Sequence, residues 1–127
     1  MSATVLVIED NPANMRLAVL LLTNAGYGVL TDTTAEAGLA TARASRPDLI
    51  LMDIQLPGMD GLAAIAELRR DETMRSIPVI ALTALAMKGD EERIRAAGFD
   101  GYIGKPMRYK EFLASIEALL SEPRRAS

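Results

Sequence analysis

The chain has 127 residues, half of them hydrophobic and 4% aromatic, with a formal net charge of -3 at pH 7. This length suits one domain with an aliphatic core, and the absence of a basic stripe argues against direct nucleic-acid binding. The sequence has no cysteine and no histidine, which excludes disulfides, thiolate metal sites, a cysteine nucleophile and a Ser-His-Asp triad.

The first predicted element is a strand over 4–8 (TVLVI), and nothing before it has the form of a signal peptide. A helix follows over about 12–25, with Asn11 as its N-cap, Pro12 at its first position and Gly26 just past its end. Its apolar run LAVLLL is far too short to span a bilayer. A soluble, cytoplasmic protein is therefore expected.

Strands and helices then alternate along the rest of the chain. The predicted strands are 28–31 (GVLT), 49–52 (LILM), 78–82 (PVIAL) and 101–103 (GYI), and the predicted helices are about 35–45, 62–70, 90–97 and 109–120. The helix over 90–97 opens with acidic residues at its positive end and contains the pairs Asp90–Arg93 and Glu91–Arg95. These elements form one domain over 1–122, and 123–127 is predicted to be a flexible tail with no output domain after it.

Strict alternation of strand and helix indicates a parallel sheet that helices cover on both faces. Right-handed crossovers then favour the flavodoxin-like strand order 2-1-3-4-5 with five helices. In this arrangement the helices over 12–25 and 109–120 cover one face and the other three cover the second face. Function is expected at the carboxyl ends of the first and third strands, where the order of the strands reverses.

The residues at these carboxyl ends suggest a chemistry. The first strand ends in Glu9 and Asp10, the third in Asp53, the fourth in Thr83, and the fifth near Lys105. Three carboxylates that converge repel one another unless a cation joins them, and oxygen ligands at an open site suit Mg²⁺. With a lysine and a hydroxyl nearby to bind phosphoryl oxygens, Asp53 could act as a nucleophile that forms an aspartyl phosphate.

Four motifs, VLVIEDN, LILMDIQLPGMDG, PVIALTA and YIGKP, occur in an order and spacing that resemble the receiver domain of two-component response regulators. The resemblance spans essentially the whole chain. The segments PDLILMDIQLP and TALAMKGDEERIRAAG resemble in particular the single-domain regulators of cell division within this family.

The resemblance implies a role for each residue at the strand ends. Asp53 would be the phosphoacceptor. Asp10 and Asp53 would bind Mg²⁺ directly, Glu9 partly through water, and the backbone carbonyl of Gln55 would complete the protein ligands. Thr83 would hydrogen-bond the phosphoryl oxygen. Lys105 would pair with the phosphoryl group, next to a cis bond to Pro106. Tyr102 would turn inward when Thr83 moves.

The resemblance also implies partners. The phosphodonor would be a histidine kinase or a histidine phosphotransfer protein, and a downstream protein target would bind a surface on the fourth helix, fifth strand and fifth helix. The chain would catalyse its own phosphorylation and slow dephosphorylation but turn over no metabolite, as a monomer or weak dimer. The wide apolar run from Leu17 to Leu22 could be a docking surface for the donor, although helix packing explains it equally well.

Simpler interpretations exist for each residue taken alone. Asp10 or Asn11 could only cap a helix, Asp53 and Lys105 could be turn residues, Thr83 could only end a strand, and Tyr102 could be an ordinary half-buried strand residue. Two other functions share parts of the pattern. A haloacid-dehalogenase phosphatase needs a second aspartate where this chain has Gln55, and a flavin-mononucleotide module needs a hydroxyl-rich phosphate loop where it has EDNPAN.

Overall fold

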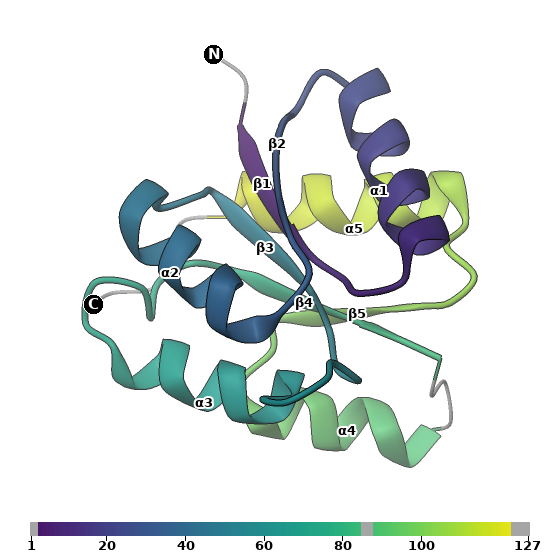
Figure 1. The fold of residues 1–127 in the computed structure, drawn as a ribbon. Helices are drawn as coiled ribbons and strands as arrows, with labels where there is room; N and C mark the ends of the chain where they lie inside the picture. Colours follow the sequence, from purple (N-terminus) through teal and green to yellow (C-terminus); the bar gives the residue numbers. More distant parts are fainter. Residues whose placement is uncertain (1–2, 85–87, 123–127) are drawn as a thin grey trace.

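The computed structural model describes residues 3–84 and 88–122. Strands and helices alternate throughout this part of the chain, as predicted (Figure 1). Their bounds are β1 Thr4–Ile8, α1 Pro12–Asn24, β2 Gly28–Asp32, α2 Ala35–Ser45, β3 Leu49–Asp53, α3 Gly61–Arg70, β4 Val79–Thr83, α4 Lys88–Ala97, β5 Gly101–Gly104 and α5 Tyr109–Ser121. The predicted tail over 123–127 lies outside the described residues.

All five strands pair in parallel in the order β2-β1-β3-β4-β5, which confirms the predicted flavodoxin-like topology. β1 pairs with β2 on one side and with β3 on the other. The direction in which successive strands are added to the sheet therefore reverses between β1 and β3. Every residue of β3 and β4 is buried. This burial on both faces explains why their sequences are uninterrupted apolar runs rather than alternating patterns.

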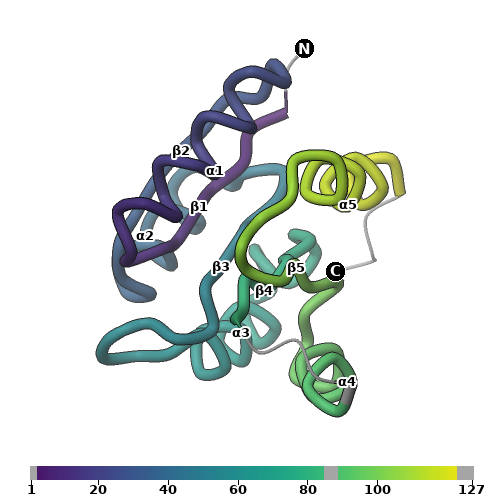
Figure 2. Tube along the Cα trace, turned by 90° about the vertical axis from the view of Figure 1, so that its right-hand side faces the viewer, coloured from purple at the N-terminus to yellow at the C-terminus, as the bar shows by residue number. Residues whose placement is uncertain are grey.

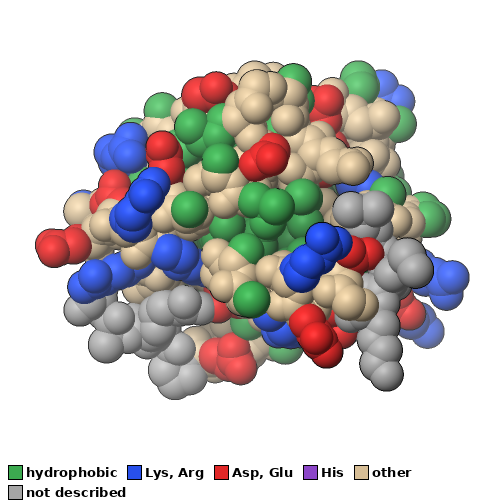
Figure 3. Space-filling model, turned by 90° about the horizontal axis from the view of Figure 1, so that it is seen from below, with side chains coloured by type: hydrophobic (Ala, Val, Ile, Leu, Met, Phe, Trp, Pro, Cys, Tyr) green, Lys and Arg blue, Asp and Glu red, His purple; other side chains and the backbone are tan. Residues whose placement is uncertain are grey.

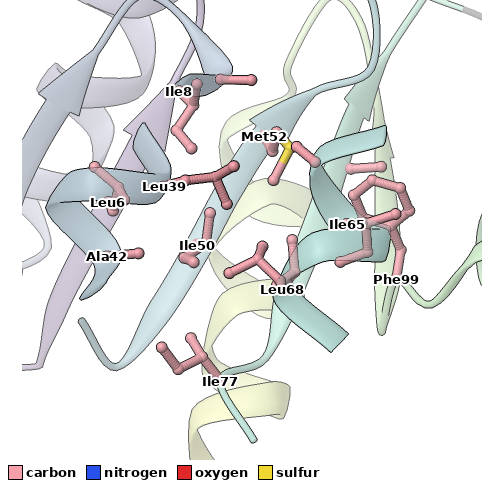
Figure 4. Packing of buried hydrophobic residues seen from close by; sticks show 14 of the residues in the cluster. Leu6, Ile8, Leu39, Ala42, Ile50, Met52, Ile65, Leu68, Ile77 and Phe99 are labelled. Atoms are coloured by element: carbon pink, nitrogen blue, oxygen red, sulfur yellow. The ribbon is translucent and has the colours of Figure 1, made fainter. Parts of the chain in front are cut away.

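The sheet separates two layers of hydrophobic core. One layer lies beneath α2, α3 and α4 and includes Leu39, Ile50, Met52 and Ile65 (Figure 4). The other lies beneath α1 and α5 and contains Phe112, the largest fully buried side chain. In Figure 2, α5 lies on one side of the sheet and α3 and α4 lie on the other. The predicted assignment of helices to faces is therefore correct.

Capping residues that are visible in the sequence set the starts of three helices. Asn11, Thr34 and Asp60 each accept a hydrogen bond from the backbone N–H three residues later, and so cap α1, α2 and α3. The predicted bounds differ from the observed ones by at most two residues, and those of β1 and α2 are the same. The strand β4 begins at Val79 rather than Pro78, since proline has no N–H for the ladder, and α4 begins at Lys88, before the acidic residues of its first turn.

Arg69 joins the amino ends of β4 and β5 to the last turn of α3. Its guanidinium donates hydrogen bonds to the carbonyls of Gly98, Arg75 and Ile77, and pairs with Asp100 at 2.7 Å. These partners come from segments before β4 and before β5, so that one half-buried side chain fixes the end of the sheet opposite the predicted site.

The surface is mixed in character. On the face that carries α3 and α4, charged side chains of both signs surround a small hydrophobic area (Figure 3). The predicted ion pairs Asp90–Arg93 and Glu91–Arg95 are present on α4. On α1, Ala18 and Leu22 are buried while Leu20 is 54% exposed, so packing does not use the whole apolar run. None of the described helices combines the length and apolar composition of a membrane span.

Candidate functional site

Three carboxylates meet at the carboxyl ends of β1 and β3. Glu9 and Asp10 follow β1, and Asp53 is the last residue of β3. Because β1 and β3 are paired neighbours, one oxygen from each of these side chains lies within 4.8 Å of the others. Glu9 is fully buried and Asp53 is 4% exposed, whereas Asp10 is exposed. The predicted convergence of these residues is therefore observed.

Lys105 brings a positive charge to these carboxylates. Its Nζ lies 2.7 Å from Asp53 Oδ2 and 2.8 Å from Glu9 Oε1, although β4 lies between β3 and β5 in the sheet. The backbone of Lys105 is fixed as well, because its N–H donates to the carbonyl of Thr83 at 2.8 Å. The bond between Lys105 and Pro106 is cis, as the resemblance implied.

Backbone N–H groups bind the other carboxylate oxygen of Asp53 and of Glu9. The N–H of Gln55 donates to Asp53 Oδ1 at 2.8 Å, and the N–H of Asn11 donates to Glu9 Oε2 at 3.3 Å. Both oxygens of Asp53 are thus occupied, one by the loop after β3 and one by Lys105. A buried carboxylate needs such partners, because without them its desolvation would be too costly.

Burial changes the protonation behaviour of the site. The pKa of Glu9 is raised from 4.5 to about 7. Desolvation is the main cause and the neighbouring Asp53 adds to the rise, whereas Lys105 opposes it. For Lys105, burial lowers the pKa, but the hydrogen bonds to Asp53 and Glu9 outweigh burial and raise the pKa overall. The lysine is therefore held in its charged form between two acidic groups.

The donor set fits a small divalent cation. It consists of hard carboxylate oxygens, with Asp10 on the exposed side and Glu9 and Asp53 behind it. Mg²⁺ prefers oxygen ligands and keeps several of its waters, so an open site with one or two direct carboxylates suits it. The charge of Lys105 offsets only part of the charge of the three acidic residues, which leaves an attraction for a cation.

The two predicted switch residues lie to one side of this cluster. Thr83 ends β4, pairs with Gly104 in the sheet and is 1% exposed. Tyr102 is half-buried and packs against the core layer beneath α2, α3 and α4. Tyr102 also lines a groove of about 420 Å³ between β5 and α5, together with Ile103, Gly104, Lys105, Pro106, Arg108, Glu111 and Ser115.

Sequence reasoning missed two features of this site. It paired Lys105 with a phosphoryl group and did not predict the direct contact with Glu9. It began the third helix at residue 62, whereas Gly61 is the first residue of α3 and packs directly against the backbone of Asp53. Gly61 directly follows the capping residue Asp60, and a glycine in that position was the available signal for the second feature.

The comparisons with known proteins agree with this geometry. The sequence model of the response regulator receiver domain family matches residues 5–117 of this chain. The chain belongs to the response regulator receiver family. Receiver domains in general are phosphorylated on an aspartate and use Mg²⁺. The matches give no support to the haloacid-dehalogenase and flavin-binding alternatives.

Individual relatives of this receiver domain are similar over their whole length. It is 46% identical to the polar-differentiation response regulator DivK of Brucella ovis over 122 residues, which cover 96% of this chain and 99% of that protein. The DivK protein of Brucella anthropi matches equally well. The fine resemblance to single-domain cell-division regulators is thereby confirmed.

Solved structures show the same fold. The receiver domain of the sensor histidine kinase PA1611 from Pseudomonas aeruginosa is 34% identical, with a TM-score of 0.88 over 96% of this chain and all of that one. That structure contains a magnesium ion in its active-site cleft. The chemotaxis response regulator CheY4 of Vibrio cholerae is 25% identical, with a TM-score of 0.88 over 94% of this receiver domain and 99% of CheY4.

The raised pKa of Glu9 predicts a pH dependence of stability in metal-free receiver domain. Between pH 4.5 and 7 the folded state binds more protons than the unfolded chain, so the contribution of Glu9 to the free energy of unfolding falls as the pH rises through this window. Glu9→Gln cannot ionise and should lack this fall. Urea unfolding of both proteins at several pH values in EDTA measures the difference, and parallel curves would contradict the burial argument.

Proposed function

We propose that this receiver domain accepts a phosphoryl group on Asp53 and that Mg²⁺ binds among Asp10, Asp53, Glu9 and the backbone carbonyl of Gln55. The observation that carries the proposal is the environment of Asp53, a nearly buried carboxylate at a strand end between a lysine and two further acids. Such an arrangement costs free energy in the resting protein, and phosphoryl transfer is a reaction that uses all of its parts.

The proposed reaction is a direct transfer from phosphohistidine. An oxygen of Asp53 attacks the phosphorus, the bond between phosphorus and the donor's imidazole nitrogen breaks, and the imidazole leaves with the electron pair. When bound, Mg²⁺ would offset the negative charge of the phosphoryl oxygens. Lys105, now paired with Asp53, would remain beside a phosphoryl oxygen, and Thr83 would donate its hydroxyl to another.

The same groups support slow removal of the phosphoryl group by water, so the chain would catalyse only its own phosphorylation and dephosphorylation. A histidine kinase or histidine phosphotransfer protein would supply the phosphoryl group. The exposed apolar residues of α1, Leu20 among them, lie on the helix that follows Asp10 and provide a docking surface for that donor. By its likeness to DivK, the receiver domain would act in the cytoplasm on cell division or polar differentiation.

The output would pass through Thr83 and Tyr102. The phosphoryl group would favour a state in which Thr83 moves toward it, and the ring of Tyr102 would then turn inward from the groove between β5 and α5. This movement alters the surface of α4, β5 and α5, where a downstream protein target would bind. A phosphoryl group shifts such an equilibrium only if it interacts better with one of the two states.

The first prediction from this proposal tests Asp53 as the phosphoacceptor. Incubation with acetyl phosphate and Mg²⁺ should add one phosphoryl group to the wild type, and Asp53→Asn should abolish the addition because the chain has no histidine or cysteine to replace the carboxylate. Intact-protein mass spectrometry measures the added mass. Unchanged labelling of Asp53→Asn would place the nucleophile elsewhere.

The second prediction concerns the metal. Mg²⁺ should raise the melting temperature because it binds the folded state, and at about a hundred times Kd the gain is about 2.7 kcal/mol. Asp10→Asn should weaken this response and stabilise the metal-free protein, since it removes one of three mutually repelling charges. Thermal unfolding with and without millimolar Mg²⁺ checks both effects, and a response equal to that of the wild type would contradict the role of Asp10.

The third prediction separates chemistry from signalling. Thr83→Ala should keep Mg²⁺ binding and labelling at Asp53, but lose most of the gain in partner affinity on phosphorylation. Couplings of this kind are typically about 1–3 kcal/mol, or roughly 5–150-fold in affinity. The measurement is the partner Kd for both proteins with and without beryllofluoride. If the ratio of affinities is the same in Thr83→Ala and wild type, the switch model is wrong.

A further inference from the structure

Gly61 lies closer to the phosphoacceptor than any side chain would permit. It is the buried first residue of α3, and a Cβ atom at this position would lie 2.7 Å from the backbone oxygen of Asp53 and 2.7 Å from the Cα of Ile54. Contacts this short essentially never occur at a real Cβ. Both neighbours are backbone atoms, so they cannot turn aside as the end of a flexible side chain can.

The contact closes the loop between β3 and α3 at its base. The N–H of Gly61 donates to the carbonyl of Ile54 at 2.8 Å, and the N–H of Ile54 donates to the carbonyl of Leu82 in β4 at 3.2 Å. The chain from Ile54 to Gly61 thus leaves the sheet and returns to the same point. Its early part carries Gln55, whose N–H holds Asp53 Oδ1 at 2.8 Å.

We infer that Gly61 is a positioning residue for phosphoryl transfer, an inference that rests on the role proposed above for Asp53. Because Gly61 has no side chain, the first turn of α3 presses against the peptide group between Asp53 and Ile54. This contact sets the direction of the Asp53 carboxylate and the path of the backbone at Gln55, which are two of the proposed metal ligands. Any side chain at position 61 moves this peptide group or lifts α3 away from it.

Two other glycines provide controls for a general loss of stability. Gly98 has a φ of +122°, and a Cβ there would lie 3.2 Å from Cγ of Arg69, so Gly98→Ala strains the chain near the amino end of β5. Gly89 lies in α4 with nothing within 4 Å of the added Cβ. Gly89→Ala should therefore be tolerated, and neither control touches the loop between β3 and α3.

The experiment compares Gly61→Ala with Gly98→Ala, Gly89→Ala and wild type. For each protein, calorimetry gives the Kd for Mg²⁺, and mass spectrometry gives the rate of labelling by acetyl phosphate at saturating Mg²⁺, both well below the melting temperature. Gly61→Ala should weaken Mg²⁺ binding and slow labelling by about tenfold to a hundredfold each, the range found when groups that orient a site are disturbed. Both controls should stay within about twofold of the wild type.

A second comparison covers the case in which Gly61→Ala does not fold. Asp60→Ala removes the cap of α3, where Asp60 accepts from the N–H of Ala63 at 2.9 Å, and Thr34→Ala removes the corresponding cap of α2 at 3.1 Å. Both should lower the melting temperature by a similar amount, because each removes one helix cap. Asp60→Ala should also weaken Mg²⁺ binding severalfold, and Asp60→Asn, which keeps the cap, should restore it.

Three results would overturn the inference. If Gly61→Ala is folded, one is a wild-type Mg²⁺ affinity and labelling rate in this variant, and another is an equal loss in Gly98→Ala. The third, if Gly61→Ala is unfolded, is the same Mg²⁺ affinity in Asp60→Ala and Thr34→Ala. The proposed function fails separately, through labelling of Asp53→Asn. If the wild type is labelled at Asp53 and Gly61→Ala keeps the wild-type Mg²⁺ affinity and labelling rate, only the positioning role of Gly61 is disproved.

Discussion

The ion-pair group of Lys105 with Asp53 and Glu9 is the interaction on which the rest of the site depends. Two nearly buried carboxylates at neighbouring strand ends would repel each other, and each would lose its hydration. The ammonium group lies within 2.8 Å of both and makes the arrangement tolerable. Removal of one partner from a buried group of charges is strongly destabilising, because an uncompensated charge remains. The parallel sheet supplies the rigid frame that holds the three side chains together.

Most of the fold could be predicted because its signals are local. The apolar runs of β3 and β4 indicated central strands, Asn11 and Pro12 marked the start of α1, and the crossover rule favoured the strand order that is observed. The convergence of Glu9, Asp10 and Asp53 followed from that order, since neighbouring parallel strands end at the same edge. The residue types at the strand ends suggested a magnesium site and an aspartyl phosphate, and the resemblance to receiver domains then assigned a role to each residue.

The remaining features depend on distances that no pattern contains. The contact of Lys105 with Glu9 requires the side chain to pass over the end of β4, and a sequence does not give the path of a side chain. The raised pKa of Glu9 reflects complete burial, which an acidic residue beside an exposed aspartate does not suggest. The base of the loop at Gly61 is a close approach between backbones, and it looks in the sequence like one more turn glycine.

The sheet also divides the part of the chain that the structure describes into two layers of core that share no side chains. Leu39, Ile65 and Phe99 pack on one face, while Leu22, Phe112 and Ile116 pack on the other. Changes in residues that lie far apart and share no partners usually combine additively. After a gene duplication, one copy can therefore accumulate substitutions in the layer of α1 and α5 while the layer of α2, α3 and α4 keeps its packing. The architecture allows the two faces of a receiver domain to diverge at different rates.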